Sequence, residues 1–156
     1  MIFRVGGIVN LLSQVVVPSN TTIAGQTATG EGIVFLGPRI TFTGSNNTIA
    51  RYLRIRYGGT AQNQDASGLA NGANMIFDHM TFTWGTDEVF SINWDSKGIS
   101  PDNIRIQNSI IGQGLHRHNH SAGGLIQTSG GKISLIGNLY ICNKTRNNKI
   151  KGINEF

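Results

Sequence analysis

Segments that alternate apolar and polar residues recur along this chain at nearly constant intervals. Strand-like segments begin at successive steps of 26, 27, 28 and 29 residues, at Ile23, Ile49, Ile76, Ile104 and Ile133. Most of these segments follow a polar turn that contains asparagine or glycine, and helical periodicity is almost absent. Self-similarity at a period of roughly 20–50 residues is typical of solenoid proteins.

The repeat contains no segment long and periodic enough to be a helix, so we expect each turn of the solenoid to consist of strands. Twenty-one glycines and a low share of charged side chains agree with many short strands and tight turns. The sequence therefore predicts an all-β fold, a right-handed single-stranded parallel β-helix of about five turns. Residues 1–156 would form a single domain. A β-sandwich is the less favoured alternative.

Alternation of apolar residues predicts one continuous strand over residues 76–84, which places Asp78 on an apolar face. A carboxylate there is costly unless it is paired. If Ile49 stacks on Ile76, then Arg51 stacks on Asp78, since each lies two residues further along. The same alignment puts Ile106 and Leu135 in this column. We therefore predict a buried ion pair between Arg51 and Asp78.

The charge balance restricts the partners that this chain can have. Thirteen basic and eight acidic side chains give a formal charge of +5, which favours nucleic acid, anionic lipid or an acidic polysaccharide. The basic residues are scattered and lack an aromatic platform, so nucleic-acid binding is not supported. The chain contains no apolar run of membrane-spanning length, no signal-peptide pattern in residues 1–20 and a single cysteine.

Six segments carry a resemblance to a known family. In chain order they are TIAGQT (22–27), IARYLRIR (49–56), FDHMTFTWGTDE (77–88), IQNSIIGQGL (106–115), HSAGGLI (120–126) and SLIGNLYICNKTRN (134–147). Together they resemble the central turns of the pectate lyases of polysaccharide lyase family 1, over nearly the whole chain. The family fold is the parallel β-helix, in agreement with the repeat.

The resemblance implies a secreted enzyme that degrades pectin. Family members cleave the acidic polysaccharide polygalacturonate by β-elimination with calcium, in a groove outside the parallel sheet. Family domains are longer than this chain, which implies a fragment that is incomplete at both ends and prone to aggregation through exposed strand edges. The complete protein would be a monomer.

The resemblance assigns the catalytic arginine to Arg146, in NKTRNNK, where Asn148 replaces a proline common in the family. Arginine side chains ordinarily stay protonated, so the residue alone indicates an electrostatic clamp, and the role of base comes from the resemblance. Lys151 matches a basic residue that binds the substrate carboxylate, and Lys149 lies beside it. Without the resemblance, the sequence alone would indicate that these residues form a solvated basic loop.

Calcium ligands follow from the resemblance in the same way. Asp65 lies thirteen residues before Asp78, at the spacing of a family calcium aspartate. Asp87 and Glu88 match the acidic position that follows the strand. Carboxylate oxygens are the ligands that calcium prefers. The alternative is that all three acids simply occupy solvated turns.

Three histidines alternate in HRHNH, and an extended strand would place them on one face. Zinc binding by His116, His118 and His120 would need further ligands, which no cysteine cluster supplies. Histidines border the substrate groove in related sequences, so substrate contact by His116 or His120 is the preferred reading.

Two other functions remain open at this stage. One is a truncated, inactive or carbohydrate-binding relative that has the groove without turnover. The other is a polygalacturonase-type glycoside hydrolase, which needs two carboxyl groups about 5–10 Å apart. Only Asp87 and Glu88 cluster in the sequence, and neighbours on a strand point apart.

Overall fold

The computed structural model describes residues 1–155, with the backbone alone for 153–155. Its regular structure consists of strands and two short 3-10 helices, η1 (Gly25–Thr27) and η2 (His116–His118). All strand pairs among the described residues are parallel. Within that part of the chain, no helix has the length and apolar character needed to span a bilayer.

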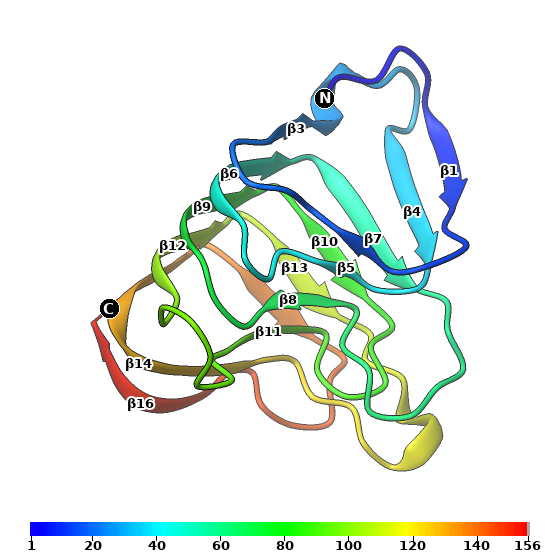
Figure 1. The fold of residues 1–156 in the computed structure, drawn as a ribbon. Coiled ribbons are helices and arrows are strands. Elements are labelled where there is room, and N and C mark those ends of the chain that lie inside the picture. The colour runs from blue at the N-terminus through cyan, green and yellow to red at the C-terminus, as the bar shows by residue number, and fades with distance from the viewer. Residues whose placement is uncertain (156) are drawn as a thin grey trace.

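The strands form three faces, here called A, B and C, which the chain visits in that order in each turn (Figure 1). Face A contains β3 (Thr22–Ala24), β6 (Asn46–Arg51), β9 (Ala73–Asp78), β12 (Asp102–Gln107) and the second part of β14 (Leu125–Ile136). Face B contains β1 (Gly7–Asn10), β4 (Ile33–Gly37), β7 (Leu53–Tyr57), β10 (Thr81–Thr83), β13 (Ile110–Gly112) and β15 (Leu139–Ile141). Face C contains β2 (Val15–Val16), β5 (Ile40–Thr41), β8 (Ser67–Leu69), β11 (Phe90–Asn93), the first part of β14 and β16 (Lys149–Glu155).

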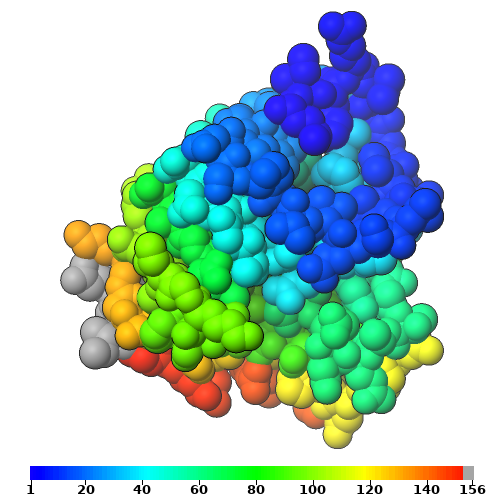
Figure 2. Space-filling view, in the orientation of Figure 1, coloured from blue at the N-terminus to red at the C-terminus, as the bar shows by residue number. Residues whose placement is uncertain are grey.

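This arrangement is a parallel β-helix of about five turns, as predicted, and the β-sandwich alternative is wrong. Successive turns stack on one another along a single axis, so the surface is coloured in bands from the N-terminus to the C-terminus (Figure 2). Residues far apart in the sequence therefore become neighbours whenever they occupy the same place in consecutive turns.

The core is the interior of the solenoid, filled by side chains from all three faces. Phe77 from β9, Phe82 from β10 and Phe90 from β11 meet there, with ring centroids 4.6–6.4 Å apart. Phe42 from the preceding turn contacts Phe77 at 4.7 Å. Full burial of such a side chain contributes about 1.5–3 kcal/mol, so this cluster joins consecutive turns as well as the three faces.

An asparagine ladder runs along the corner that precedes face A. The side-chain amide of Asn47 donates to Asn20, that of Asn74 to Asn47, and that of Asn103 to Asn74, at 2.8–3.1 Å. All four residues have φ between 51° and 58°, the left-handed region that asparagine tolerates better than most residues. The polar turns predicted before each strand are therefore also bonds between turns.

The predicted ion pair between Arg51 and Asp78 is present. The two residues are aligned in β6 and β9, and both Nε and Nη2 of Arg51 lie within 2.8 Å of Asp78 Oδ2. The other oxygen, Oδ1, contacts His79 Nδ1 at 2.7 Å and accepts hydrogen bonds from Gln107 and Asn108. The Asp78 side chain is 3% exposed, whereas that of Arg51 is 41% exposed, so only the acid is buried.

Burial favours the neutral acid, but these hydrogen bonds act in the opposite direction and are stronger. Together they lower the pKa of Asp78 to about 2. The carboxylate is thus ionised in the native state and holds side chains from three turns.

Two details of the predicted alignment are wrong. The strand is interrupted at His79, whose φ of 53° turns the chain, so β9 and β10 present their core residues in different phases. In β9 the core residues are Met75 and Phe77, and Ile76 faces outward. Asp78 is consequently aligned with Gln107, one residue after the predicted Ile106. The prediction was wrong because it aligned Ile76, which faces outward, with an isoleucine that faces inward.

In the next turn the column reaches Ile136, and not the predicted Leu135. An amide at the Gln107 position can donate to Asp78, which an isoleucine could not do. The corrected register therefore supplies the carboxylate with one more partner.

The corners between faces A and B differ in length from the loops between faces B and C. After β6, β9, β12 and β14 the corner has one or two residues, whereas the loops that lead to face C cover residues 58–66, 84–89, 113–124 and 142–148. The long loops all leave the same edge of the solenoid. They contain most of the acidic, basic and imidazole side chains singled out by the sequence.

We expect Asp78→Ala to unfold the protein or make it insoluble, because four side chains lose their shared partner. Each buried hydrogen-bonding group that is left unpaired typically costs about 1–3 kcal/mol. Soluble yield and thermal unfolding by circular dichroism measure the effect, with the exposed Asp95→Ala as control. A soluble Asp78→Ala protein with the wild-type melting temperature would contradict this role.

The stabilisation from Asp78 should also depend on pH. Its pKa is lower in the folded state than in the unfolded state, so the contribution is present above about pH 5 and is lost as pH falls toward 2. At pH 6 we expect urea unfolding to show that wild type is more stable than Asp78→Asn. At low pH this difference in the free energy of unfolding should be smaller by about 2–3 kcal/mol. A difference that does not change with pH would exclude Asp78 as the titrating group.

Candidate functional site

The predicted acidic and basic site residues meet at the loops that precede face C. Asp65 lies just before β8, Glu88 just before β11 and Arg146 just before β16. Bridges from Glu88 to Ala122 and from Ala122 to Thr145 align these loops in consecutive turns. The spacing of the solenoid therefore brings together residues that are 23 and 58 positions apart.

The three predicted calcium ligands carry neighbouring negative charges and are here called the acidic cluster. Among the described residues, only Asp87 and Glu88 of these three belong to a group close enough to share a metal ion, and its third member is His120. One Asp65 oxygen accepts a hydrogen bond from the backbone N–H of Glu88 at 3.2 Å. The backbone N–H groups of Thr86 and Asp87 both donate to the Gln64 carbonyl, and these hydrogen bonds fix the Asp87 loop against the preceding turn. One ligand atom each of Asp87, Glu88 and His120 lies within 4.8 Å of the other two.

Arg146, the predicted catalytic residue, contacts this cluster directly. Its guanidinium group donates to the carboxylate of Glu88, whose side chain is 7% exposed. Two glycines allow the Arg146 loop to come so close: the N–H groups of Gly123 and Gly124 donate to the carbonyls of Thr145 and Arg146. A Cβ on Gly123 would lie 2.8 Å from the Arg146 carbonyl oxygen, so any side chain there would displace the loop.

A positive charge near the cluster would be electrostatically favourable. Burial, followed by the negative charges of Asp65 and Asp87, raises the pKa of Glu88 to about 7, although Arg146 opposes this shift. Burial also raises the pKa of Asp65, against the influence of Arg39. The oxygen donors and their mutual repulsion fit a hard cation such as Ca²⁺, which would relieve that repulsion.

Two residues of the cluster were missed in the sequence. Arg39 pairs with Asp65 at 3.4 Å, and the Ser91 hydroxyl donates to the same carboxylate. Arg39 precedes Asp65 by 26 residues, and Ser91 follows it by 26. That interval is the repeat period, so the stacking argument that paired Arg51 with Asp78 could also have found both.

The predicted substrate-binding lysines lie on β16, at the C-terminal side of the same loop. Lys149 is aligned with Leu125, and Lys151 with Gln127. Both alternate with Ile150, which follows the inward position of Ile126, so they project from the outer side of face C. Lys151 also lines a depression of about 410 Å³ with Trp94 and Gln127.

The histidines were predicted to share one face of an extended strand, and this prediction is wrong. His116 and His118 belong to the 3-10 helix η2, because the loop coils back after Leu115. His120 lies beyond it, with Nε2 2.7 Å from Asp87 Oδ1, and thus joins the acidic cluster. His118 contacts Gln62 at 3.0 Å, and His116 is exposed. The structure brings only His120 to the candidate site.

Comparisons with known proteins agree with this arrangement. No family model matches the chain. It is 52% identical over its whole length to "Probable pectate lyase C" of Aspergillus flavus and of Neosartorya fischeri, and 48% identical to the protein of that name from Emericella nidulans. The chain is thus similar over its whole length to part of these proteins. It spans about 36% of the length of the Aspergillus and Neosartorya relatives and 35% of the Emericella relative.

The pectate lyase resemblance inferred from six short segments is therefore confirmed along the complete chain. In this chain, the segment 77–88 serves two purposes. Its first part, at Asp78, holds the solenoid together, and its last part, at Asp87 and Glu88, belongs to the acidic cluster. About one third of a turn of the solenoid separates them.

The electrostatic coupling within the cluster can be measured through Glu88. We expect Asp65→Asn to lower the pKa of Glu88 below about 7, because it removes a neighbouring negative charge. Arg146→Gln should raise that pKa further, since it removes the opposing positive charge. A carbon-13 NMR titration of the glutamate side-chain carboxyl groups measures both shifts. The remote Glu31→Gln is the control, and equal titration of Glu88 in all variants would contradict the coupling.

Proposed function

We propose that this chain carries a pectate lyase site that cleaves polygalacturonate by calcium-assisted β-elimination. The observation that supports it most directly is the contact between Arg146 and Glu88. The contact joins two side chains that are 58 residues apart, and it supports a shared site in which we assign Arg146 as the base and Glu88 as a cation ligand. The homologues named pectate lyase support the same reaction class.

In the proposed reaction, the proton on the carbon next to a uronate carboxylate is removed. The electrons of that C–H bond form a carbon–carbon double bond, the adjacent glycosidic C–O bond breaks, and the leaving oxygen takes a proton. We assign removal of the first proton to Arg146. Its guanidinium group is held by Glu88. Because its side chain is 30% exposed, a polymer on the surface can still reach it.

We assign the cation ligands to Asp65, Asp87 and Glu88, whose oxygens suit Ca²⁺. When bound, Ca²⁺ would neutralise the negative charge of the substrate carboxylate and thereby make the neighbouring C–H bond more acidic. Arg39 would keep Asp65 ionised and oriented. His120 would hold Asp87, and through it the geometry of the acidic loop.

We assign binding of substrate carboxylates to Lys151, with Lys149 as a second positive charge on the same strand face. Each basic side chain offers a charge-assisted hydrogen bond to a uronate. His116 would contact the polymer further along the loop edge. The partner is thus an acidic polysaccharide outside the cell, and we propose that the protein acts as a secreted enzyme.

An assay on polygalacturonate tests the proposal. Ultraviolet absorbance of the unsaturated product should rise with Ca²⁺ and stop on addition of a chelator. Arg146→Lys should reduce the rate by about 10²–10⁴-fold, the range typical for loss of a positioned base. Arg105→Lys, an exposed substitution on face A, is the matched control and should retain wild-type rate.

Other outcomes would replace the proposal by a named alternative. New reducing ends without the absorbance of a double bond would mean hydrolysis. Polymer binding that is retained in Arg146→Lys, with neither product formed by wild type, would mean a carbohydrate-binding protein without turnover.

A further inference from the structure

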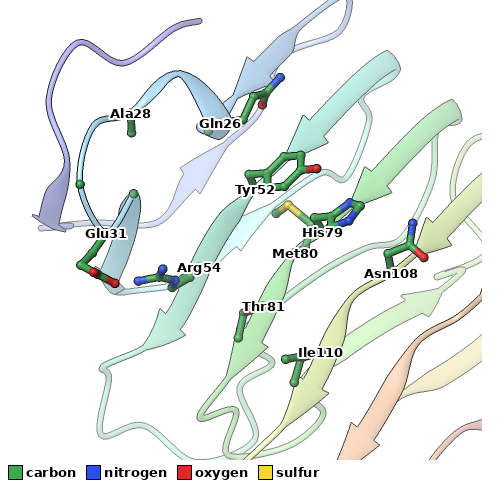
Figure 3. Close-up of a pocket in the computed structure, with 13 residues that line it drawn as sticks. Gln26, Ala28, Glu31, Tyr52, Arg54, His79, Met80, Thr81, Asn108 and Ile110 are labelled. Carbon is green, nitrogen blue, oxygen red and sulfur yellow. The ribbon is translucent and has the colours of Figure 1, made fainter.

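A second groove lies on face B, away from the loops that carry Arg146 and the acidic cluster. It has a volume of about 530 Å³ and runs across the starts of β7, β10 and β13 (Figure 3). The corner between β3 and β4, which covers residues 25–32, forms one wall. In the later turns of the described chain this corner has one or two residues, so among those turns only the first provides such a wall.

The opposite side of the groove is a column of turn residues from three successive turns. Tyr52, His79 and Asn108 all have φ between 50° and 55°, and each lies at the corner between faces A and B. The rings of Tyr52 and His79 are stacked, with centroids 4.5 Å apart and planes 9° apart. Arg51 lies over the Tyr52 ring at 5.7 Å.

The buried carboxylate of Asp78 fixes this column. Its Oδ1 atom contacts His79 Nδ1 at 2.7 Å and accepts a hydrogen bond from the Asn108 amide at 3.3 Å. The contact through Nδ1 leaves the Nε2 atom of His79 for a ligand. The polar groups on this side of the groove are therefore oriented before any ligand arrives, which reduces the entropic cost of binding.

The floor of the groove is a second column, two residues further along the strands. Arg54, Thr81 and Ile110 are aligned in β7, β10 and β13. Arg54 forms no ion pair with any residue whose side chain the structure describes. Glu31, on the wall, points toward Arg54 in Figure 3. The groove thus combines one available guanidinium group with a hydroxyl, an amide, an imidazole and a single carboxylate.

We propose that this groove binds a carboxylated oligosaccharide, with the sugar carboxylate on Arg54 and the hydroxyl groups on His79, Asn108 and Thr81. Guanidinium groups bind carboxylates through two parallel hydrogen bonds. Interleaved donors and acceptors beside aromatic ring edges suit the hydroxyl groups of a sugar chain. Glu31 can accept hydrogen bonds from the hydroxyl groups of the sugar.

The groove would hold the polymer without cleaving it. Arg146, Asp65, Asp87 and Glu88 all lie on the loops that lead to face C, and none of them lines the groove. Two sites on one solenoid raise the effective concentration of the polymer at the surface. The choice of galacturonate as a probe rests on the proposed function, whereas the groove itself stands on its own residues.

An NMR titration of the full chain with trigalacturonate tests this inference. The chelator EDTA is present, so that Ca²⁺ does not contribute at the acidic cluster. We expect the backbone amide signals of residues 52, 54, 79 and 108 to shift. Arg54→Gln should weaken this binding by about tenfold or more, as expected for loss of a hydrogen-bonded charge.

Three controls make the result specific. Arg105→Gln removes an exposed arginine on face A and should bind as wild type does. Arg146→Gln should also retain the shifts, because it alters the proposed lyase site alone. Maltotriose, a neutral sugar of equal length, should bind more weakly than trigalacturonate.

The inference is overturned if the shifts are confined to the loops around Glu88 and Arg146, or if Arg54→Gln binds like wild type. Equal affinity for maltotriose would also overturn the assignment of the carboxylate to Arg54. An absence of shifts at millimolar trigalacturonate would overturn the groove as a sugar site. Failure of the lyase assay together with retained shifts would contradict the proposed function alone.

Discussion

The carboxylate of Asp78 is the interaction on which much of this solenoid depends. Backbone hydrogen bonds hold adjacent strands together but are the same at every register, so they do not by themselves select one. A buried charge does select one, because its partners have to arrive at a single position. Arg51 from the turn before and Gln107 and Asn108 from the turn after satisfy it, and they thereby set the alignment of three turns.

The acidic cluster uses the same device for a different purpose. Asp65, Asp87 and Glu88 are held close together although their charges repel, and Arg39, His120 and Arg146 each approach one of them. At Asp78 the surrounding donors fully compensate the charge and lower the pKa. At Glu88 the compensation is incomplete and the pKa is raised. Incomplete compensation is the more useful state for a site that has to receive a cation or an anionic substrate.

Much of the fold could be predicted from the sequence because every turn repeats the same few requirements. The period, the polar corners and the pair of Arg51 with Asp78 all follow from stacking. The register after Asp78 could not be predicted, since the left-handed conformation of His79 changes which residues face inward. Such a conformation is expected first for glycine or asparagine, and histidine adopts it more often than most residues but too rarely for a single histidine to indicate it.

The candidate site shows the same division. In the structure Asp65 and Arg146, two residues that the family resemblance singled out, each contact Glu88. Arg39 and Ser91 were missed, although they occur one period on either side of Asp65. His116 was misplaced because alternation in HRHNH resembles a strand, and local coiling into η2 removes it from the cluster. Loops of this kind carry little periodicity, so patterns in the sequence constrain them weakly.

The unequal lengths of the corners have a consequence for how such proteins can diverge. From β6 onward, corners of one or two residues between faces A and B transmit the alignment from strand to strand, so an insertion in one of them would disturb the neighbouring contacts. The loops that lead to face C begin and end on strands whose positions are already set by their neighbours. They can therefore gain or lose residues at little cost to folding, because each doubling of a loop adds only about 0.6 kcal/mol. The edge before face C can therefore vary in length and side chains, whereas from β6 onward the edge between faces A and B keeps the strands in register.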